Sequence, residues 1–234
     1  MGVSEDPRQL TRDQLLARHI KGGFWWTRVL SQRLGSVFSL PAIRRGVHPS
    51  TLTLGSLLVA TVVAVVAIVL LPDQRVAAGL VLLVGWELAY ALDCGDGQVA
   101  RATGRGSVAG ARLDLTVDYA GYASFAAVMV VAARGTVDAA VLALAAFAYA
   151  FQLFDEASGR AGDAGDPTVD RGGVLYQLAG LARDPGPQRA AAAVGVAVGA
   201  WPATLVLLAL GCLGALQLVA RVVVLDRRSR RGSA

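Results

Sequence analysis

Long apolar segments constrain this 234-residue chain more than any other feature of its sequence. The chain is 55% hydrophobic and only 17% charged, whereas soluble domains carry about 25% charged residues. Several apolar stretches approach the ~20 residues that a helix needs to cross a bilayer. We therefore expect an all-α integral membrane protein.

Turn-forming and charged residues divide the apolar sequence into six expected membrane spans. Pro49, with Ser50 or Thr51 as a cap, is typical of a helix start. We expect spans at about 50–71, 76–100, 107–133, 137–155, 188–201 and 203–225. The predicted organisation is a basic N-terminal juxtamembrane region (1–46), a six-helix membrane domain (47–226) and a basic tail (227–234).

Basic residues at both ends of the chain predict its orientation. Arginines recur in residues 1–46 and again in residues 227–231. Because Lys and Arg collect on the cytoplasmic side, both termini are expected there, on the inner face of the cell membrane. The aromatic cluster Phe24–Trp26 predicts an amphipathic helix over about 24–38 on the same surface. The net charge of +5 fits anionic headgroups better than nucleic acid, since the basic residues flank spans.

Four aspartates, Asp93, Asp96, Asp114 and Asp118, lie inside or beside the second and third expected spans. A carboxylate at bilayer depth is costly and needs a partner or a water-filled cavity. Four of them beside a single arginine would repel one another unless positive charge lay between them. Oxygen ligands suit Mg²⁺, Mn²⁺ or Ca²⁺, and a pair of divalent ions is the simplest interpretation. A structural ion-pair network is less favoured, because one arginine cannot balance four acids.

The spacing of these residues predicts two functional helix faces, since residues three and four apart share a face. The first face carries Asp93, Asp96, Gly97, Ala100 and Arg101, and the second carries Gly110, Asp114 and Asp118. Small residues on these faces let the helices approach closely or admit a ligand. Packed together, the two faces would direct all four carboxylates into one pocket, an arrangement suited to two-metal displacement at phosphorus.

The segment from Asp93 to Asp118 follows the pattern D-x-x-D-G-x-x-A-R-x8-G-x-x-x-D-x-x-x-D. It resembles the signature of the CDP-alcohol phosphotransferases (CDP-alcohol phosphatidyltransferases) at every fixed position. These membrane enzymes break the pyrophosphate of a CDP-linked alcohol, release CMP and move the phosphoryl-alcohol onto a second alcohol. The resemblance therefore implies a transferase of phospholipid biosynthesis, and it suggests a homodimer.

The resemblance also implies a role for each residue of the signature. Asp93, Asp96, Asp114 and Asp118 would hold two divalent cations, Mg²⁺ or Mn²⁺, and Asp118 would also be the general base on the acceptor hydroxyl. The CDP moiety would contact Asp93, Gly97, Ala100, Arg101 and Gly110, with Arg101 on the phosphates. These roles agree with physical chemistry, because a planar guanidinium suits phosphate oxygens and glycine lets a nucleotide lie against the backbone.

The sequence leaves both substrates open. Phe154-Asp155-Glu156 resembles a Trp-Glu-Glu stretch of aminoalcohol phosphotransferases, where acidic residues would suit a cationic acceptor. Residues 21–28 and 48–53 resemble other branches of the family, including enzymes that handle inositol phosphates, and an anionic acceptor would need a basic residue. The candidate basic residues are Arg112, Arg160, Arg171, Arg183 and Arg221, and our predicted acceptor site is Asp155, Glu156, Arg160 and Arg221. CDP-diacylglycerol is the favoured donor, because the site lies at the membrane surface, and a soluble CDP-polyol is the alternative.

A cation transporter is the rival interpretation from another class, because acids inside a membrane also mark ion paths. The aspartates cluster near one membrane face and do not run across the bilayer. Arg101 and the glycines have no evident task in a cation path. A purely structural scaffold leaves the cost of four buried acids unexplained.

Overall fold

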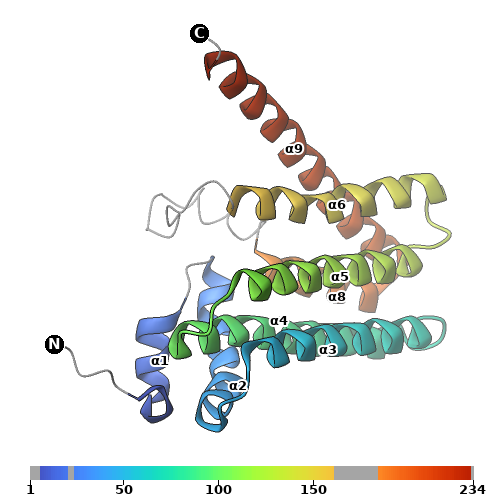
Figure 1. Ribbon diagram of the computed structural model, residues 1–234. Coiled ribbons are helices and arrows are strands. Elements are labelled where there is room, and N and C mark those ends of the chain that lie inside the picture. Colours follow the sequence, from blue (N-terminus) through green and yellow to red (C-terminus); the bar gives the residue numbers. More distant parts are fainter. Residues whose placement is uncertain (1–5, 21–23, 161–183, 233–234) are drawn as a thin grey trace.

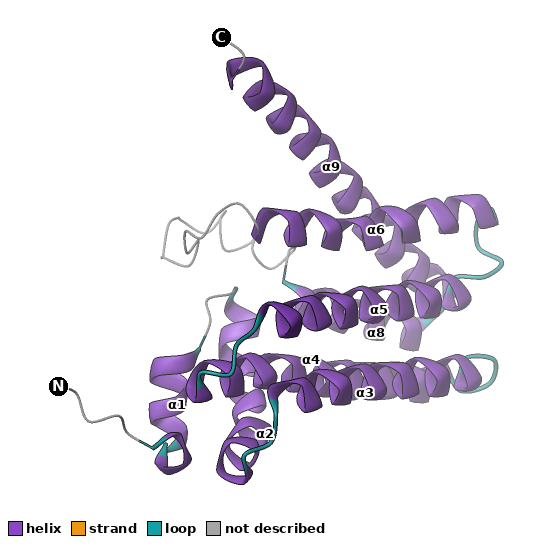
Figure 2. Ribbon diagram, in the orientation of Figure 1, coloured by secondary structure: helices purple, strands orange, loops and turns teal. Residues whose placement is uncertain are grey.

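The computed structural model describes residues 6–20, 24–160 and 184–232, apart from the side chains of residues 152–160, 221 and 224–232. The described part of the chain is helical and contains no strand (Figure 2). Its main helices are α1 (Arg12–His19), α2 (Gln32–Arg45), α3 (Pro49–Leu70), α4 (Arg75–Thr103), α5 (Val108–Ala132), α6 (Ala139–Arg160), α8 (Pro185–Val198) and α9 (Ala200–Gly232). A 3-10 turn, Pro7–Gln9, precedes α1, and a π-helical segment, η2 (Thr27–Ser31), leads into α2.

Helix α4 is central to the bundle, where it packs against α2, α3 and α8, while α5 packs against α3 and α6 (Figure 1). Helices α6 and α9 pack together, and α9 extends beyond the bundle to the C-terminus. The end of the bundle where residues 93–118 join α4 to α5 is called the motif end here. Helices α1 and α2 lie at this end, and the turn from α3 to α4 lies at the opposite, far end (Figure 1).

Capping residues fix where the helices of the motif end begin and stop. Gly46 ends α2 with a φ of 69°, and Gly104 ends α4 with a φ of 65°, a conformation that favours glycine. The ring of His48 then accepts a hydrogen bond from the backbone N–H of Ser50 at the start of α3. Ser107 caps α5 by accepting from the N–H of Gly110 at 3.0 Å. These short connections hold the last turn of α4 beside the first turn of α5.

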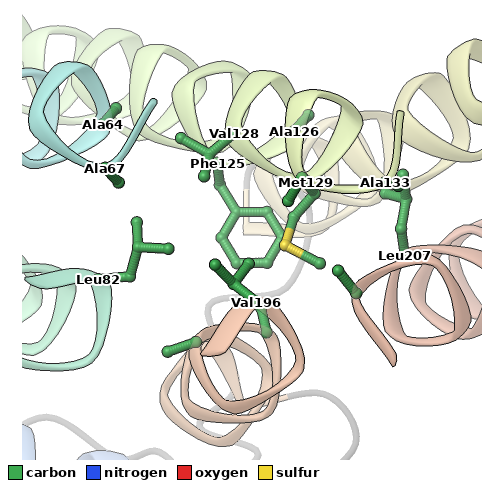
Figure 3. Packing of buried hydrophobic residues seen from close by; sticks show 14 of the residues in the cluster. Ala64, Ala67, Leu82, Phe125, Ala126, Val128, Met129, Ala133, Val196 and Leu207 are labelled. Atoms are coloured by element: carbon green, nitrogen blue, oxygen red, sulfur yellow. The ribbon is translucent and has the colours of Figure 1, made fainter. Parts of the chain in front are cut away.

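The main core consists of apolar side chains from several helices, which pack closely together (Figure 3). Its residues lie in the middle and toward the far end of the bundle. Phe125 and Met129 of α5 are nearly inaccessible to solvent. Leu82 of α4, Val196 of α8 and Leu207 of α9 pack around them. This apolar cluster ties α4, α5, α8 and α9 together.

Close helix contacts depend on glycine at two crossings. A Cβ placed on Gly79 would lie 2.6 Å from the carbonyl oxygen of Ala193, where α4 meets α8. A Cβ on Gly211 would lie 2.7 Å from the Cα of Ala145, where α9 meets α6. Small residues at such crossings are typical of helix packing in membranes.

A second apolar cluster attaches the N-terminal region to the motif end. Leu15 of α1 is fully buried, and Ile43 of α2 and Val99 of α4 belong to the same cluster, together with Leu10, Ala42 and Leu52. The helix predicted over 24–38 is therefore part of a longer element that continues through α2 to Arg45. It is longer because the first residue with a left-handed stop conformation is Gly46. Helix α1 was not predicted separately.

Four described helices are long and apolar enough to cross a membrane: Pro49–Leu70, Arg75–Thr103, Val108–Ala132 and Ala200–Ala220. Of the other two predicted spans, one corresponds to α6, whose apolar part among the fully described residues is Ala139–Phe151, and the other to the 14-residue α8. Large apolar side chains such as Val69 (71% exposed) and Val84 (67%) point outward from the spans. Apolar surface of this kind suits lipid contact, and the helices indicate a multi-pass membrane protein.

Candidate active site

Three of the four signature aspartates form one cluster at the motif end. Asp93 and Asp96 lie one turn apart on α4, and Asp114 lies on the facing part of α5. One carboxylate oxygen from each residue lies within 4.8 Å of those of the other two. Oxygen ligands about 2.0–2.6 Å from one cation lie at most about 5 Å apart, so this spacing fits a bound divalent ion. The donor set is that of Mg²⁺, Mn²⁺ or Ca²⁺.

Asp96 is oriented by a threonine from a third helix. The hydroxyl of Thr53, on α3, donates a hydrogen bond to Oδ2 of Asp96. Both side chains are buried, with Asp96 only 7% exposed. A hydrogen-bonded partner of this kind fixes the direction of a metal-binding carboxylate.

Asp118 lies one turn beyond Asp114 and is not a member of the three-carboxylate cluster. It lines a small cavity of about 30 Å³, together with Asp93, Tyr90 and Ser56. A cavity of this size has room for roughly one water molecule. Asp93 is shared between the cluster and this cavity, so Asp118 lies on the side of the cluster that faces α8.

An arginine that the sequence did not single out lies in the same small cavity. Arg189 of α8 lines it beside Asp93 and Asp118. The Cζ atom of Arg189 lies 5.0 Å from the ring centre of Tyr90 and 5.9 Å from that of Tyr122, within range of cation–π attraction. The signal was present, because Arg189 is a lone charge in a segment of alanine and valine that was expected to enter the membrane.

A larger pocket of about 170 Å³ opens on the other side of the cluster. Five signature residues line it: Asp96, Gly97, Ala100, Gly110 and Asp114. The first turns of α3 and α5 also face it, through Ser50 and Ser107 among others. Helix N-termini attract anions, so this pocket combines carboxylates with two helix starts that favour a negatively charged group.

Arg105, in the turn between α4 and α5, is the basic residue that lines this larger pocket. Its Nη1 donates to the carbonyl oxygen of Gly46 at 3.0 Å. From the sequence, Arg105 had no predicted role in the site. Its position depends on the contact between that turn and the end of α2, which no local pattern encodes.

Arg101 of the signature does not line either of these two pockets. Its Nε donates to the backbone carbonyl oxygen of His19, at 2.9 Å, and its Nη atoms lie beside Gly97. Burial, followed by the charges of Arg101 and Arg18, lowers the pKa of His19. This lower pKa favours a neutral His19 imidazole at pH 7, next to the positively charged Arg101.

The predicted acceptor residues lie where side chains are not described. Asp155, Glu156 and Arg160 belong to the last turns of α6, and Arg221 belongs to α9, but none has a described side chain. Arg171 and Arg183 lie outside the described residues altogether, and Arg112 is exposed on α5.

A known protein family matches this part of the chain. The family described as CDP-alcohol phosphatidyltransferase matches residues 46–157, from the end of α2 to the last turns of α6. This range contains the whole signature, the cluster and Arg105. No curated protein matches the chain. The matched range, the signature and the aspartate cluster agree, and the chain therefore carries a domain of the CDP-alcohol phosphatidyltransferase family at residues 46–157.

Proposed function

We propose that this protein transfers a phosphoryl-alcohol group, in particular a phosphatidyl group, from a CDP-alcohol to an acceptor alcohol, releases CMP and so serves phospholipid biosynthesis. The observation that carries the proposal is the convergence of Asp93, Asp96 and Asp114 beside a pocket inside the family domain. Asp93, Asp96, Asp114 and Asp118 would hold two divalent cations, Mg²⁺ or Mn²⁺. Bound there, such ions would neutralise the pyrophosphate and the leaving CMP.

The larger pocket is proposed to receive the CDP moiety. Gly97, Ala100 and Gly110 leave room for a nucleotide against the helices. The N-termini of α3 and α5 face this pocket and would attract an anion through their helix dipoles, and Arg105 adds a positive charge. Arg101 is proposed to bind the phosphates from the other side of Gly97.

Asp118 is proposed to be the general base. It would accept the proton of the acceptor hydroxyl while that oxygen forms a bond to the β-phosphorus of the donor. The bond from this phosphorus to the bridging oxygen breaks, and its electron pair leaves with CMP. The position of Asp118 next to Asp93, but facing α8, supports entry of the acceptor from that side.

Arg189 favours an anionic acceptor, because it is a guanidinium beside the proposed base. A cationic alcohol is the alternative acceptor, and Asp155 and Glu156 would bind it. For an anionic acceptor, Arg160 and Arg221 are further candidate ligands. CDP-diacylglycerol is the proposed donor, and a soluble CDP-polyol the alternative, since the apolar outer surface of the helices suits a lipid.

The proposed topology has six spans, with both termini and the site on the cytoplasmic side of the cell membrane. Helix α6 and the 14-residue α8 would supply the two remaining spans. Trp25, 58% exposed, and Val37, 54% exposed, support contact between the N-terminal amphipathic segment and the membrane surface.

The test is release of CMP by purified protein in detergent, with CDP-diacylglycerol as the donor and Mg²⁺ or Mn²⁺ present. The acceptor panel is glycerol 3-phosphate, inositol, inositol 1-phosphate, serine, phosphatidylglycerol and aminoalcohols. We expect metal-dependent CMP release with a phosphate-bearing acceptor. Silence across the panel, with CMP still bound in a metal-dependent way, would point to a CDP-polyol donor. Loss of both release and CMP binding would overturn the proposal and favour the cation path.

A further inference from the structure

Arg101 is held by a helix that lies outside both the signature and the matched family range. Its Nε donates to the carbonyl oxygen of His19, the last residue of α1, at 2.9 Å. The carbonyls of the last helical turn lack partners within their own helix, and they carry the negative end of the helix dipole. A guanidinium is therefore a favourable partner for this end of α1.

The contact with His19 uses one of the five N–H groups of Arg101, and the remaining four belong to its two terminal nitrogens. These nitrogens lie over Gly97. A Cβ placed on Gly97 would be 2.9 Å from Nη1 and 3.4 Å from Nη2 of Arg101. Gly97 lines the larger pocket, so the terminal nitrogens of Arg101 lie next to a pocket residue, although Arg101 itself does not line the pocket, while Nε is held by α1.

Helix α1 is itself docked firmly enough to act as a support. Its Leu15 is fully buried in the cluster that includes Val99, two residues before Arg101 on α4. On its outer side, Arg12 donates from Nε to Ser36 Oγ at 2.8 Å, and from Nη2 to the carbonyl oxygen of Arg33 at 2.9 Å. Helix α1 is therefore fixed to both α2 and α4 close to the arginine that it contacts.

We propose that the last turn of α1 positions Arg101 for the phosphates of the nucleotide, so that the N-terminal region is a working part of the CDP site. This inference rests on the proposed function. The carbonyl of His19 fixes Nε and thereby aims the two terminal nitrogens across Gly97 toward the pocket. Without α1, Arg101 would keep its charge but would have to order its side chain on binding, which weakens the affinity for nucleotide.

The test is a double-mutant cycle on CMP affinity, measured by calorimetry in detergent with Mg²⁺. Leu15→Ala loosens α1 from the core, and Arg12→Ala loosens it from α2 without opening a cavity. Each is expected to raise the Kd for CMP, by about tenfold for Leu15→Ala and less for Arg12→Ala. In an Arg101→Ala background the same changes are expected to alter the Kd less than about twofold, because the positioned group is gone.

Two matched controls separate positioning from general loss of structure. Leu82→Ala opens a cavity at an equally buried leucine of the main core, and Arg134→Ala removes an exposed arginine at the far end. Both should leave the Kd for CMP unchanged. The volume-conserving change Leu15→Met should restore nearly normal affinity.

Amide hydrogen exchange of residues 12–19 gives a readout that needs neither donor nor turnover. Since coupling is reciprocal, Arg101→Ala is expected to speed exchange in α1, and CMP with Mg²⁺ to slow it in the unmodified protein. Equal losses of affinity from Leu15→Ala with and without Arg101, or unchanged exchange in Arg101→Ala, would overturn the inference while leaving the proposed function intact. Failure of the unmodified protein to bind CMP would overturn the proposed function, and the positioning role with it.

Discussion

The two ends of the bundle use the same helices for opposite purposes. Toward the far end, α4 and α5 contribute Leu82, Phe125 and Met129 to the apolar main core. At the motif end, about three to four turns away on the same two helices, Asp93, Asp96 and Asp114 approach within 4.8 Å of one another. The far part of each helix is stabilised by burial of apolar side chains. At the motif end, neighbouring carboxylates repel one another, and apolar packing does not relieve that repulsion.

The comparison shows where stability and function are separated in this molecule. Carboxylates brought together in an apolar setting raise the free energy of the folded state unless cations accompany them. The main core is the part that offsets this cost, because burial of large side chains is favourable and independent of any ligand. Changes at the motif end should therefore alter activity and metal dependence, and changes in the main core should alter stability.

The largest expected effect is that of Asp118→Asn on turnover. The amide cannot accept the proton of the acceptor hydroxyl, so CMP release should fall about 10³-fold or more. CMP binding should change little, since Asp118 does not line the larger pocket. Asp73→Asn, an exposed acid in the turn at the far end, is the matched control and should be active. A misfolded Asp118→Asn protein would place this residue in a structural role instead.

Phe125→Ala tests the other half of the comparison. Removing a ring that is 1% exposed, and that lies 4.7 Å from the ring of Trp86, should lower the free energy of unfolding by about 3 kcal/mol. Unfolding by SDS titration measures this loss. The Mg²⁺ dependence of CMP binding by the folded fraction should stay as it is. A changed metal dependence would mean that the two ends are not independent.

Thr53→Val tests whether the α3 hydroxyl orients Asp96. The change keeps the shape of the side chain and removes the hydrogen bond to Asp96, so the affinity for Mg²⁺ should fall about tenfold. Thr61→Val is the matched control on α3, because the Thr61 hydroxyl bonds only to the carbonyl of Leu57 in its own helix. Mg²⁺ titration of CMP binding compares the two variants. Equal affinities would contradict an orienting role for Thr53.

The smallest expected effect concerns the start of α5. Ser107→Ala removes the cap that accepts from the N–H of Gly110, and this should cost about 1 kcal/mol of stability. Ser124→Ala, in the middle of the same helix, should cost less, because the Ser124 hydroxyl only supplements a carbonyl bonded within the helix. Thermal unfolding in detergent distinguishes them, and a larger loss at Ser124 would rule out capping as the cause.

Sequence reasoning reached the parts of this structure that local spacing encodes. The helical class and the approach of Asp93 and Asp96 to Asp114 follow from apolar length and from three- and four-residue spacing. The sequence did not predict contacts between segments that are distant along the chain. Arg189, Arg105 and Thr53 reach the site from α8, a turn and α3, and the pairing of Arg101 with His19 joins residues 82 positions apart. Such pairings depend on how helices pack, and no periodicity within one helix encodes them.

Metal dependence of CMP binding tests whether the aspartate cluster is a metal centre. Calorimetry would compare the unmodified protein in Mg²⁺, in Mn²⁺ and in excess chelator, with Asp93→Asn alongside. We expect CMP to bind with either metal, to lose its affinity in chelator, and to bind Asp93→Asn weakly at any metal concentration. Equal CMP affinity with and without divalent ions, or an unchanged metal requirement in Asp93→Asn, would contradict the assignment of this cluster as the metal centre of a CDP-alcohol site.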